Sequence, residues 1–176
     1  MNSRELLHRI RRVRLVIFDV DGVLTDGGIS ITDAGDEIKT FNSRDGHGMK
    51  LLMRAGIEVA ILTGRTSRVV EHRARELGIT HVVQGARDKR VALLDLAERI
   101  GIDPAAMAYM GDDVVDLPPM VLCGLTFAPA DAVDMVRDRA DVVTTLPGGR
   151  GAAREAIEVL LKRLGLFEKV MERYGV

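Results

Sequence analysis

The chain has 176 residues, of which 47% are hydrophobic and 29% charged, and its formal net charge is −1. This length suits one well-cored domain, and the composition is that of an ordinary soluble globular protein. The near-neutral charge and an aromatic content of 3% give no electrostatic or stacking basis for binding nucleic acid or an anionic membrane. No signal peptide is recognisable and no apolar run approaches about 18 residues, so we expect a cytoplasmic protein.

The first strong signal is the apolar run Leu15–Phe18, which follows a basic, amphipathic lead-in over residues 1–13. The run predicts a buried parallel strand. It is followed by two carboxylates, and because strand side chains alternate, Asp19 and Asp21 should leave the same face at its carboxyl end. Adjacent carboxylates repel each other, which raises one pKa unless a cation intervenes. The pair therefore indicates a hard metal ion or an acid/base couple.

A β-hairpin is predicted over residues 29–41, because two alternating segments flank a polar turn at residues 33–35. A polar loop over residues 42–48 then leads to a short helix over residues 49–54.

From residue 58 onward, predicted strands and helices alternate. The expected strands cover 58–62, 81–83, 107–110, 125–128 and 141–144, and the expected helices cover 67–77, 89–100, 132–139 and 152–164. This order implies an α/β fold with a Rossmann-like, doubly wound parallel sheet that carries helices on both faces. We see no linker or repeat. Residues 1–176 are therefore predicted to form one domain, with a C-terminal tail over residues 166–176.

Polar residues follow four of these segments, and the carboxyl ends of parallel strands meet at one edge of a sheet. The residues concerned are Asp19, Asp21, Thr63, Gly64, Arg65, Lys89, Asp112 and Asp113. Carboxylates are the ligands that Mg²⁺ prefers, whereas a hydroxyl, a loop amide and a lysine suit phosphate oxygens. Each residue also has a plainer interpretation. An aspartate or Thr63 could cap the helix that follows it, and Lys89 could be a solvated helix residue.

In this order, the segments resemble the motifs of the haloacid dehalogenase superfamily of phosphohydrolases. The matching stretches are 19–25, 63–65, Lys89 and 111–116. The resemblance implies that Asp19 is the nucleophile that forms an aspartyl-phosphate. It also implies that Asp21 is the general acid and then the base, with its backbone carbonyl facing the metal.

The same resemblance implies Mg²⁺ as the cofactor, with Asp19, Asp21 and Asp112 as metal-site residues. Thr63, the Gly64 amide and Lys89 would hold the phosphoryl oxygens. Two further carboxylates are implied to support the site: Asp113, which would orient a metal-bound water or the lysine, and Asp116.

The segment between Asp21 and Thr63 is filled by the hairpin and a short helix, which leaves no room for a cap domain. Within the superfamily the chain resembles one capless branch, the 3-deoxy-D-manno-octulosonate 8-phosphate (Kdo 8-phosphate) phosphatases of lipopolysaccharide biosynthesis. Further matching stretches are 41–46, 78–81, 109–113 and 148–151. The resemblance implies a homotetramer that is packed through the hairpin, with active sites covered by neighbouring subunits.

A sugar acid phosphate carries a carboxylate, so further cations are expected near the site. Arg65 could bind that carboxylate with both arms of its guanidinium, and Arg73 has either a structural carboxylate or a ligand as its partner. Positions that resemble the sugar-contacting residues of the branch are Asn42, Ser43, Arg44, Asp45, Gly46 and Lys50. The plainer interpretation of this loop is a helix start that Asp45 caps. Arg150 could contact a ligand across a subunit boundary or cap a strand edge, and we expect His47 in a loop or an interface.

Two rival interpretations remain. The nonulosonate 9-phosphate phosphatases share the capless fold but tend to carry an acidic residue where Arg65 and Arg150 stand here, which favours the octulosonate. A non-catalytic, phospho-accepting receiver module would place its acceptor aspartate after the third strand, and none follows Val82-Val83.

Overall fold

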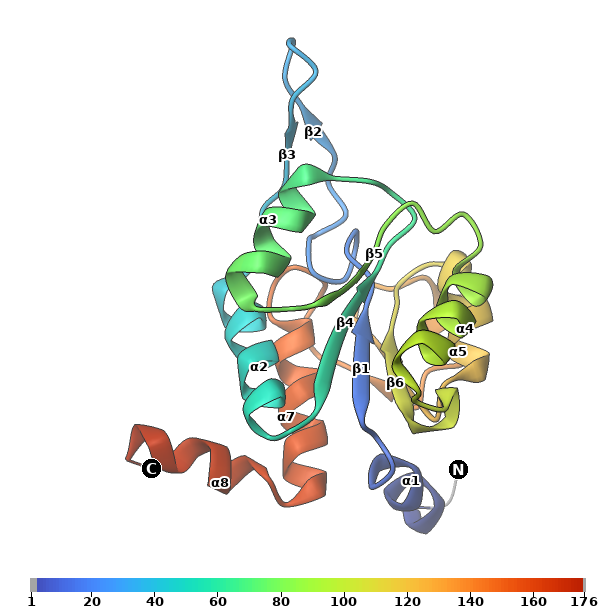
Figure 1. Cartoon of the computed structure of the whole chain (residues 1–176), viewed down its shortest axis with the longest axis vertical. Coiled ribbons are helices and arrows are strands. Elements are labelled where there is room, and N and C mark those ends of the chain that lie inside the picture. Colours follow the sequence, from blue (N-terminus) through green and yellow to red (C-terminus); the bar gives the residue numbers. More distant parts are fainter. Residues whose placement is uncertain (1–2, 176) are drawn as a thin grey trace.

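The centre of the fold is a six-stranded parallel sheet in the order β5-β4-β1-β6-β7-β8 (Figure 1). The computed structural model describes residues 3–175; Met1, Asn2 and Val176, which the predicted lead-in and tail include, lie outside the described residues. The strands are β1 (Leu15–Phe18), β4 (Glu58–Leu62), β5 (His81–Val83), β6 (Met107–Met110), β7 (Leu125–Ala128) and β8 (Val142–Val143). The predicted doubly wound α/β fold is confirmed.

Helices cover both faces of the sheet (Figure 1). The helices on one side are α1 (Ser3–Ile10), α2 (Ser43–Arg54), α3 (Arg68–Leu77), α7 (Ala152–Leu164) and α8 (Phe167–Met171), and those on the other are α4 (Lys89–Ile100), α5 (Leu117–Leu122) and α6 (Asp134–Arg137). Short 3₁₀ turns are η1 (Pro104–Ala106), η2 (Val114–Asp116) and η3 (Glu172–Tyr174). The two faces enclose two separate apolar cores.

Strand β1 divides its side chains between the two cores. Val16 and Phe18 pack on the α2/α7 side, whereas Leu15 and Ile17 pack on the α4/α5 side. Because both faces are covered, the strand is apolar at every position instead of alternating. In the register with its two neighbours, Phe18 lies level with Ile61 of β4 and Met110 of β6. The segments that follow these three strands therefore begin side by side.

The predicted hairpin projects beyond the carboxyl edge of the sheet (Figure 1). It contains β2 (Ser30–Ile31) and β3 (Glu37–Ile38), which pair antiparallel. Its exposed side chains include three isoleucines, since Ile29, Ile31 and Ile38 are each more than half exposed.

Helix α2 starts earlier than predicted. Residues 42–48 form its N-cap and first turns instead of a loop, and the side chain of Asn42 accepts a hydrogen bond from the Arg44 N–H at 2.8 Å. Asp45 does not cap this helix. It is buried and accepts hydrogen bonds from the backbone N–H groups of Gly151 at 3.2 Å and Arg154 at 2.7 Å, so it caps α7. The polar residues that indicated a loop instead cap two helices: Asn42 caps α2 and Asp45 caps α7.

Other boundaries differ at short elements. The helix expected over 132–139 covers only Asp134–Arg137, the strand expected over 141–144 covers Val142–Val143, and α5, with two prolines in its first turn, was not predicted. These segments are too short for periodicity to define.

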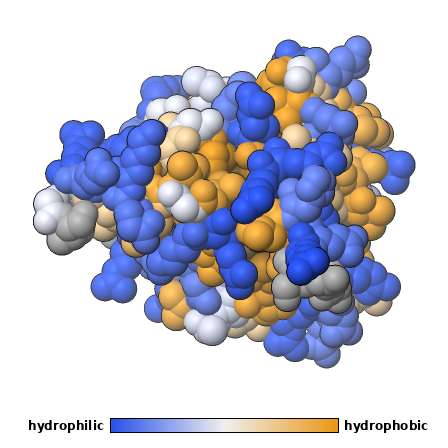
Figure 2. Space-filling view, turned by 90° about the horizontal axis from the view of Figure 1, so that it is seen from below, coloured by the Kyte–Doolittle hydropathy of each residue, from blue (hydrophilic) through white to orange (hydrophobic). Residues whose placement is uncertain are grey.

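The C-terminal segment folds back on its own chain through α8 and η3. The Tyr174 hydroxyl lies 3.0 Å from His47 Nε2 and accepts a hydrogen bond from Arg54. Seen from the end of the molecule that carries both termini, hydrophilic and hydrophobic side chains are interspersed (Figure 2). Within residues 3–175, no helix has the length and apolar character needed to cross a membrane.

Candidate active site

A cavity of about 300 Å³ lies at the carboxyl ends of β1, β4 and β6. It is lined by Asp19, Asp21, Gly27, Thr63, Gly64, Arg65, Lys89, Asp112, Asp113 and Val115. The structure thus brings together residues from all four segments that the sequence singled out. Parallel strands in register cause this convergence, because each segment begins where its strand ends.

Lys89 is the first residue of α4 and points into this cavity. Its Nζ lies 2.9 Å from Asp19 Oδ2 and 2.6 Å from Asp116 Oδ1, and its side chain is 5% exposed. The interpretation of Lys89 as a solvated helix residue is therefore wrong. The lysine places a positive charge directly beside the carboxylate of Asp19.

Asp116 is fully buried, and four donors use its two oxygens. Oδ1 accepts from Lys89 Nζ and from the Tyr109 hydroxyl at 2.7 Å, while Oδ2 accepts from the N–H groups of Asp112 at 3.0 Å and Asp113 at 3.3 Å. Asp116, and not Asp113, is thus the residue that orients the lysine. Tyr109 was not predicted to take part; its hydroxyl at a buried strand position, seven residues before Asp116, was the available signal.

Negative charge around Asp19 is incompletely compensated. Burial, then the charge of Asp116, raises the pKa of Asp19 to about 6 against the opposing effect of Lys89. Burial, then the charges of Asp19 and Asp116, raises the pKa of Asp112 to about 8. The Oδ1 atoms of Asp19 and Asp112 are buried and, within the described residues, have no hydrogen-bond partner.

These orphaned oxygens fit a divalent cation. Asp19, Asp112 and Asp116 each offer an oxygen within 4.8 Å of the others. Because Asp116 already satisfies four donors, Asp19 and Asp112 are the two carboxylates free to hold the ion. The Asp21 carboxylate is outside this cluster of described residues. Its predicted link to the metal therefore depends on its backbone carbonyl.

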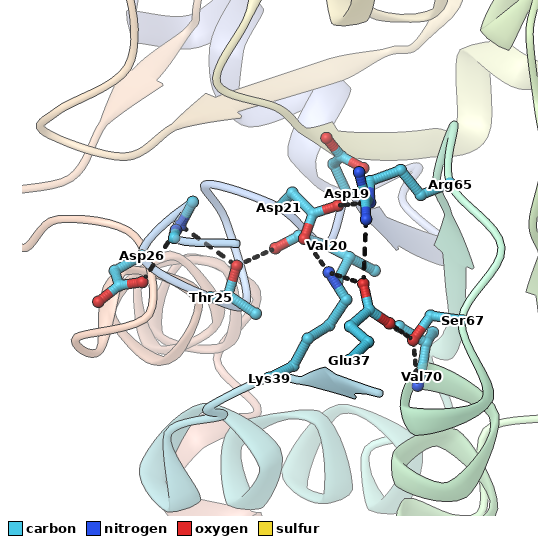
Figure 3. Close-up of polar contacts among 12 residues, drawn as sticks. Asp19, Val20, Asp21, Thr25, Asp26, Glu37, Lys39, Arg65, Ser67 and Val70 are labelled. Atoms are coloured by element: carbon cyan, nitrogen blue, oxygen red, sulfur yellow. Dashed lines mark hydrogen bonds and ion pairs between the residues drawn. The ribbon is translucent and has the colours of Figure 1, made fainter. Parts of the chain in front are cut away.

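The Asp21 carboxylate instead faces the hairpin (Figure 3). It pairs with Lys39, and its Oδ2 lies 3.7 Å from Arg65 Nε. Glu37 joins the same group, since its Oε1 lies 3.3 Å from Lys39 Nζ and 3.2 Å from Arg65 Nη2. Sequence reasoning treated Glu37 and Lys39 only as hairpin residues. Their two-residue spacing on either side of an apolar residue was the signal that they share a face.

Gly22 allows the first and last motifs to approach each other. Its φ is +87°, and a side-chain carbon at this position would overlap the carboxylate of Asp112. Gly148 makes a similar approach to the carbonyl of Gly22. The loop over residues 147–151 therefore packs against the loop that carries Asp21.

The helix-cap interpretations have different outcomes. Thr63 is buried and is not the cap of α3, because Ser67 occupies that position and its hydroxyl accepts from the Val70 N–H at 3.4 Å. Asp113 is an exposed cap of η2, where it accepts from the Val114 N–H at 2.7 Å.

The predicted sugar-contacting residues are dispersed. Arg73 pairs with Glu76 at 2.8 Å, and its guanidinium lies 5.8 Å from the Phe41 ring centroid. Of the two partners considered for Arg73, a structural carboxylate or a ligand, the structure shows the carboxylate. Arg73 is not among the described residues that line the catalytic cavity. Arg44 and Arg150 line a separate groove of about 630 Å³.

The remaining predicted positions lie on α2. Ser43 is exposed at its first residue and Lys50 is half-buried further along it. Gly46 packs against Arg73, where a larger residue would overlap the guanidinium.

Arg150, which precedes α7, lies 3.6 Å from Asp26 in the loop that follows strand β1.

The fold and the cavity define a Rossmann-like α/β protein in which a strand-end aspartate lies beside a lysine and a second, buried carboxylate. A family model described as haloacid dehalogenase-like hydrolase matches residues 36–124. A curated 3-deoxy-D-manno-octulosonate 8-phosphate phosphatase from Escherichia coli K12 is 46% identical over 167 residues, which cover 95% of this chain and 89% of that protein.

Solved structures agree with this match. The phosphatase of the same description from Yersinia pestis is 43% identical, with a TM-score of 0.90 over 93% of this chain and 89% of that one. The one from Moraxella catarrhalis, in complex with a magnesium ion, a phosphate ion and a KDO molecule, is 38% identical, with a TM-score of 0.94 over 98% and 99%. The chain therefore belongs to the haloacid dehalogenase-like hydrolases and, among them, to the family of the 3-deoxy-D-manno-octulosonate 8-phosphate phosphatases.

Proposed function

We propose that the chain hydrolyses Kdo 8-phosphate to Kdo and inorganic phosphate in lipopolysaccharide biosynthesis, with Mg²⁺ as cofactor. The observation that carries this proposal is the buried Asp19 carboxylate, which is held by Lys89 at 2.9 Å and has one oxygen without a partner among the described residues. The family of its relatives supplies the substrate.

In this proposal Asp19 attacks the phosphorus of the substrate. The bond from phosphorus to the sugar oxygen breaks as the bond to the carboxylate forms, which gives an aspartyl-phosphate. Lys89, the Thr63 hydroxyl and the Gly64 amide, which all line the cavity, bind the phosphoryl oxygens and stabilise their charge. Asp116 is a positioning residue that holds Lys89 in place.

Asp21 transfers the protons. Its carboxyl group gives a proton to the leaving sugar oxygen, and the resulting carboxylate then removes a proton from the water that attacks the aspartyl-phosphate. That second step releases phosphate and restores Asp19. Asp21 lines the cavity with Asp19 but is less buried, its side chain being 22% exposed, which suits exchange of a proton with water.

Asp19 and Asp112 would hold Mg²⁺, together with the backbone carbonyl of Asp21. When bound, the ion supplies neutralising charge for the phosphoryl oxygens. Asp113, at the rim of the cavity, would orient water beside the ion.

The sugar end of the substrate is assigned to arginines. Arg65, at the mouth of the cavity and 46% exposed, would bind the substrate carboxylate. Arg73, Asn42 and the α2 residues Ser43, Arg44, Gly46 and Lys50 remain predicted sugar-binding positions, whereas both carboxylate oxygens of Asp45 accept hydrogen bonds from the backbone of α7. Because these positions lie mostly outside the catalytic cavity of the same chain, their contribution is proposed to come through a neighbouring subunit.

We infer a homotetramer for the same reason. Within residues 3–175 no cap domain covers the cavity, and the hairpin presents Ile29, Ile31 and Ile38 to solvent. These side chains form an apolar surface suited to another copy of the chain. Residues 1–176 are proposed to act as one domain, in the cytoplasm.

A phosphate-release assay tests the proposed function. We expect Kdo 8-phosphate to be hydrolysed at least about tenfold more efficiently than nonulosonate 9-phosphates or hexose phosphates. Equal efficiency on all three would reduce the assignment to a general phosphatase, and a preference for the nonulosonates would favour the alternative. A lasting aspartyl-phosphate without turnover would instead support a phospho-accepting module.

A further inference from the structure

We infer that Lys39, a residue of the hairpin, is a positioning residue for proton transfer by Asp21. The inference rests on the proposed function, in which Asp21 protonates the leaving sugar oxygen. It assigns to the hairpin a part in the reaction besides its part in subunit packing.

The Lys39 side chain is directed inward although the hairpin itself projects into solvent. Only 2% of this side chain is exposed, and its ammonium group pairs with Asp21 Oδ1 and lies 3.3 Å from Glu37 Oε1 (Figure 3). A buried lysine is stable only where carboxylates compensate its charge. Asp21 and Glu37 supply that compensation, so the position of Lys39 and the position of Asp21 depend on each other.

The hairpin geometry produces this contact. Along β3 and the residue after it, Glu37 and Lys39 lie on the side that faces Asp21 and Arg65, while Ile38 between them is 55% exposed, as the two-residue period of a strand requires. Glu37 also accepts a hydrogen bond from the hydroxyl of Ser67, the N-cap of α3. The hairpin is therefore hydrogen-bonded to the body of the protein two residues before the lysine.

The pairing distinguishes the two oxygens of Asp21. Lys39 occupies Oδ1, whereas the nearest cation to Oδ2 is Arg65 Nε at 3.7 Å, beyond hydrogen-bond distance. Oδ2 is therefore the oxygen left to carry the proton. In the first step the O–H bond at Oδ2 breaks and the proton joins the sugar oxygen, which keeps the electron pair of the broken P–O bond. The ammonium group of Lys39 stabilises the carboxylate that forms.

The test compares two substrates that differ in their need for a proton. The alkyl leaving group of Kdo 8-phosphate must be protonated, whereas the phenolate of p-nitrophenyl phosphate departs without help. Because hydrolysis of the aspartyl-phosphate is common to both substrates, the first step is measured alone, in single turnovers. We expect Lys39→Met to lower the rate of aspartyl-phosphate formation from Kdo 8-phosphate by about 10- to 100-fold, while the rate from p-nitrophenyl phosphate falls no more than about threefold. Lys39→Arg, which keeps a cation, should restore part of the difference. Lys162→Met removes an exposed lysine that pairs with Glu158 and serves as the matched control.

A double-mutant cycle shows whether Lys39 acts through Asp21. In an Asp21→Asn background, Lys39→Met should change the rate of aspartyl-phosphate formation from Kdo 8-phosphate by less than about twofold, because the group that it positions is gone. An undiminished effect in that background, or equal losses on both substrates in the single variant, would overturn the inference. Circular dichroism melts identify variants that do not fold.

Glu37→Gln is the milder second variant if Lys39→Met does not fold. It removes one of the two carboxylates that hold the ammonium group, and we expect the same selective loss on Kdo 8-phosphate, smaller in size; an unchanged ratio between the two substrates would overturn the inference. The unmodified chain tests the proposed function separately. If it hydrolyses neither substrate, or if Asp21→Asn does not lower its activity on Kdo 8-phosphate, the proposed function fails, independent of Lys39.

Discussion

Two lysines with buried side chains pair with the two aspartates that follow strand β1, and each lysine is shared by two carboxylates. Lys89 lies between Asp19 and Asp116 and is 5% exposed, while Lys39 lies between Asp21 and Glu37 and is 2% exposed. The carboxylates differ: the Asp19 and Asp116 side chains are 8% and 0% exposed, but those of Asp21 and Glu37 are 22% and 20% exposed.

The difference follows from where each group is built. The Lys89 group is part of the packed core, because Asp19 follows strand β1, Lys89 begins α4 and Asp116 ends η2. The Lys39 group includes residues of a projecting hairpin, whose exposed side chains include three isoleucines. A nucleophile needs a rigid, buried environment, whereas a proton carrier must exchange with water. In the proposed mechanism, covalent chemistry therefore takes place in the core and proton transfer at its more exposed edge.

Replacing the nucleophile should have the largest effect. Asp19→Asn keeps the shape of the side chain but cannot form the aspartyl-phosphate, so kcat on Kdo 8-phosphate should fall by at least about 10⁴-fold. A circular dichroism melt should show a folded protein. Activity within tenfold of the unmodified chain would contradict the assignment of Asp19.

Removing the metal should have the next largest effect. Excess chelator should lower turnover by at least about 10³-fold, because the phosphoryl charge then lacks its counter-ion. Independently of activity, adding Mg²⁺ should raise the melting temperature, since the ion binds only the folded chain. Asp112→Asn should abolish this rise. Full turnover in chelator would refute the metal role.

The two lysines should differ in their contribution to stability. Lys89→Met leaves the buried Asp19 and Asp116 carboxylates without their cation, and should lower the free energy of unfolding by about 3–5 kcal/mol. Lys39→Met should cost less than about half of that, because its partners are partly solvated and Arg65 remains beside them. Urea denaturation measures both. Equal losses of unfolding free energy in the two variants would contradict the difference proposed between the Lys39 and Lys89 groups.

A smaller effect is expected from pH. The Ser67 hydroxyl, then Lys39 and Arg65, lower the pKa of Glu37 below 4.5 against the effect of burial. Because the folded pKa is depressed, the stabilisation is complete above 4.5 and is lost as the pH falls through the folded value. The difference in unfolding free energy between the unmodified chain and Glu37→Gln should therefore be below about 1 kcal/mol and greatest near neutral pH. A difference that grows on acidification would contradict this sign.

Much of the fold was accessible from local pattern. The buried strand Leu15–Phe18, the order of strands and helices, and the cap glycines at 78 and 101 follow from hydrophobic period and backbone preference. The convergence of the strand ends at one edge also follows, because parallel strands share a direction. The short segments α5 and α6 were missed or misplaced because they span too few residues to show a period.

Long-range contacts could not be predicted in the same way. Asp45 was expected to cap its own helix or contact a sugar, yet it caps α7 more than a hundred residues away. Residues 42–48 were therefore mistaken for a loop. A side chain that hydrogen bonds to distant backbone has no local periodicity, so nothing in its neighbourhood reveals the partner.

The amino-acid sequence by itself indicated the parallel sheet and the edge at which Asp19, Thr63, Lys89 and Asp112 gather, because these depend on the alternation of strands and helices along the chain and on strand direction. Only the tertiary structure decided how the charges are shared. It turned Asp21 toward Lys39, joined Asp116 to both Lys89 and Tyr109, and left one oxygen each of Asp19 and Asp112 free for a cation. Those pairings depend on which side chains of separate elements come within a few ångströms of each other, and that distance is set by packing.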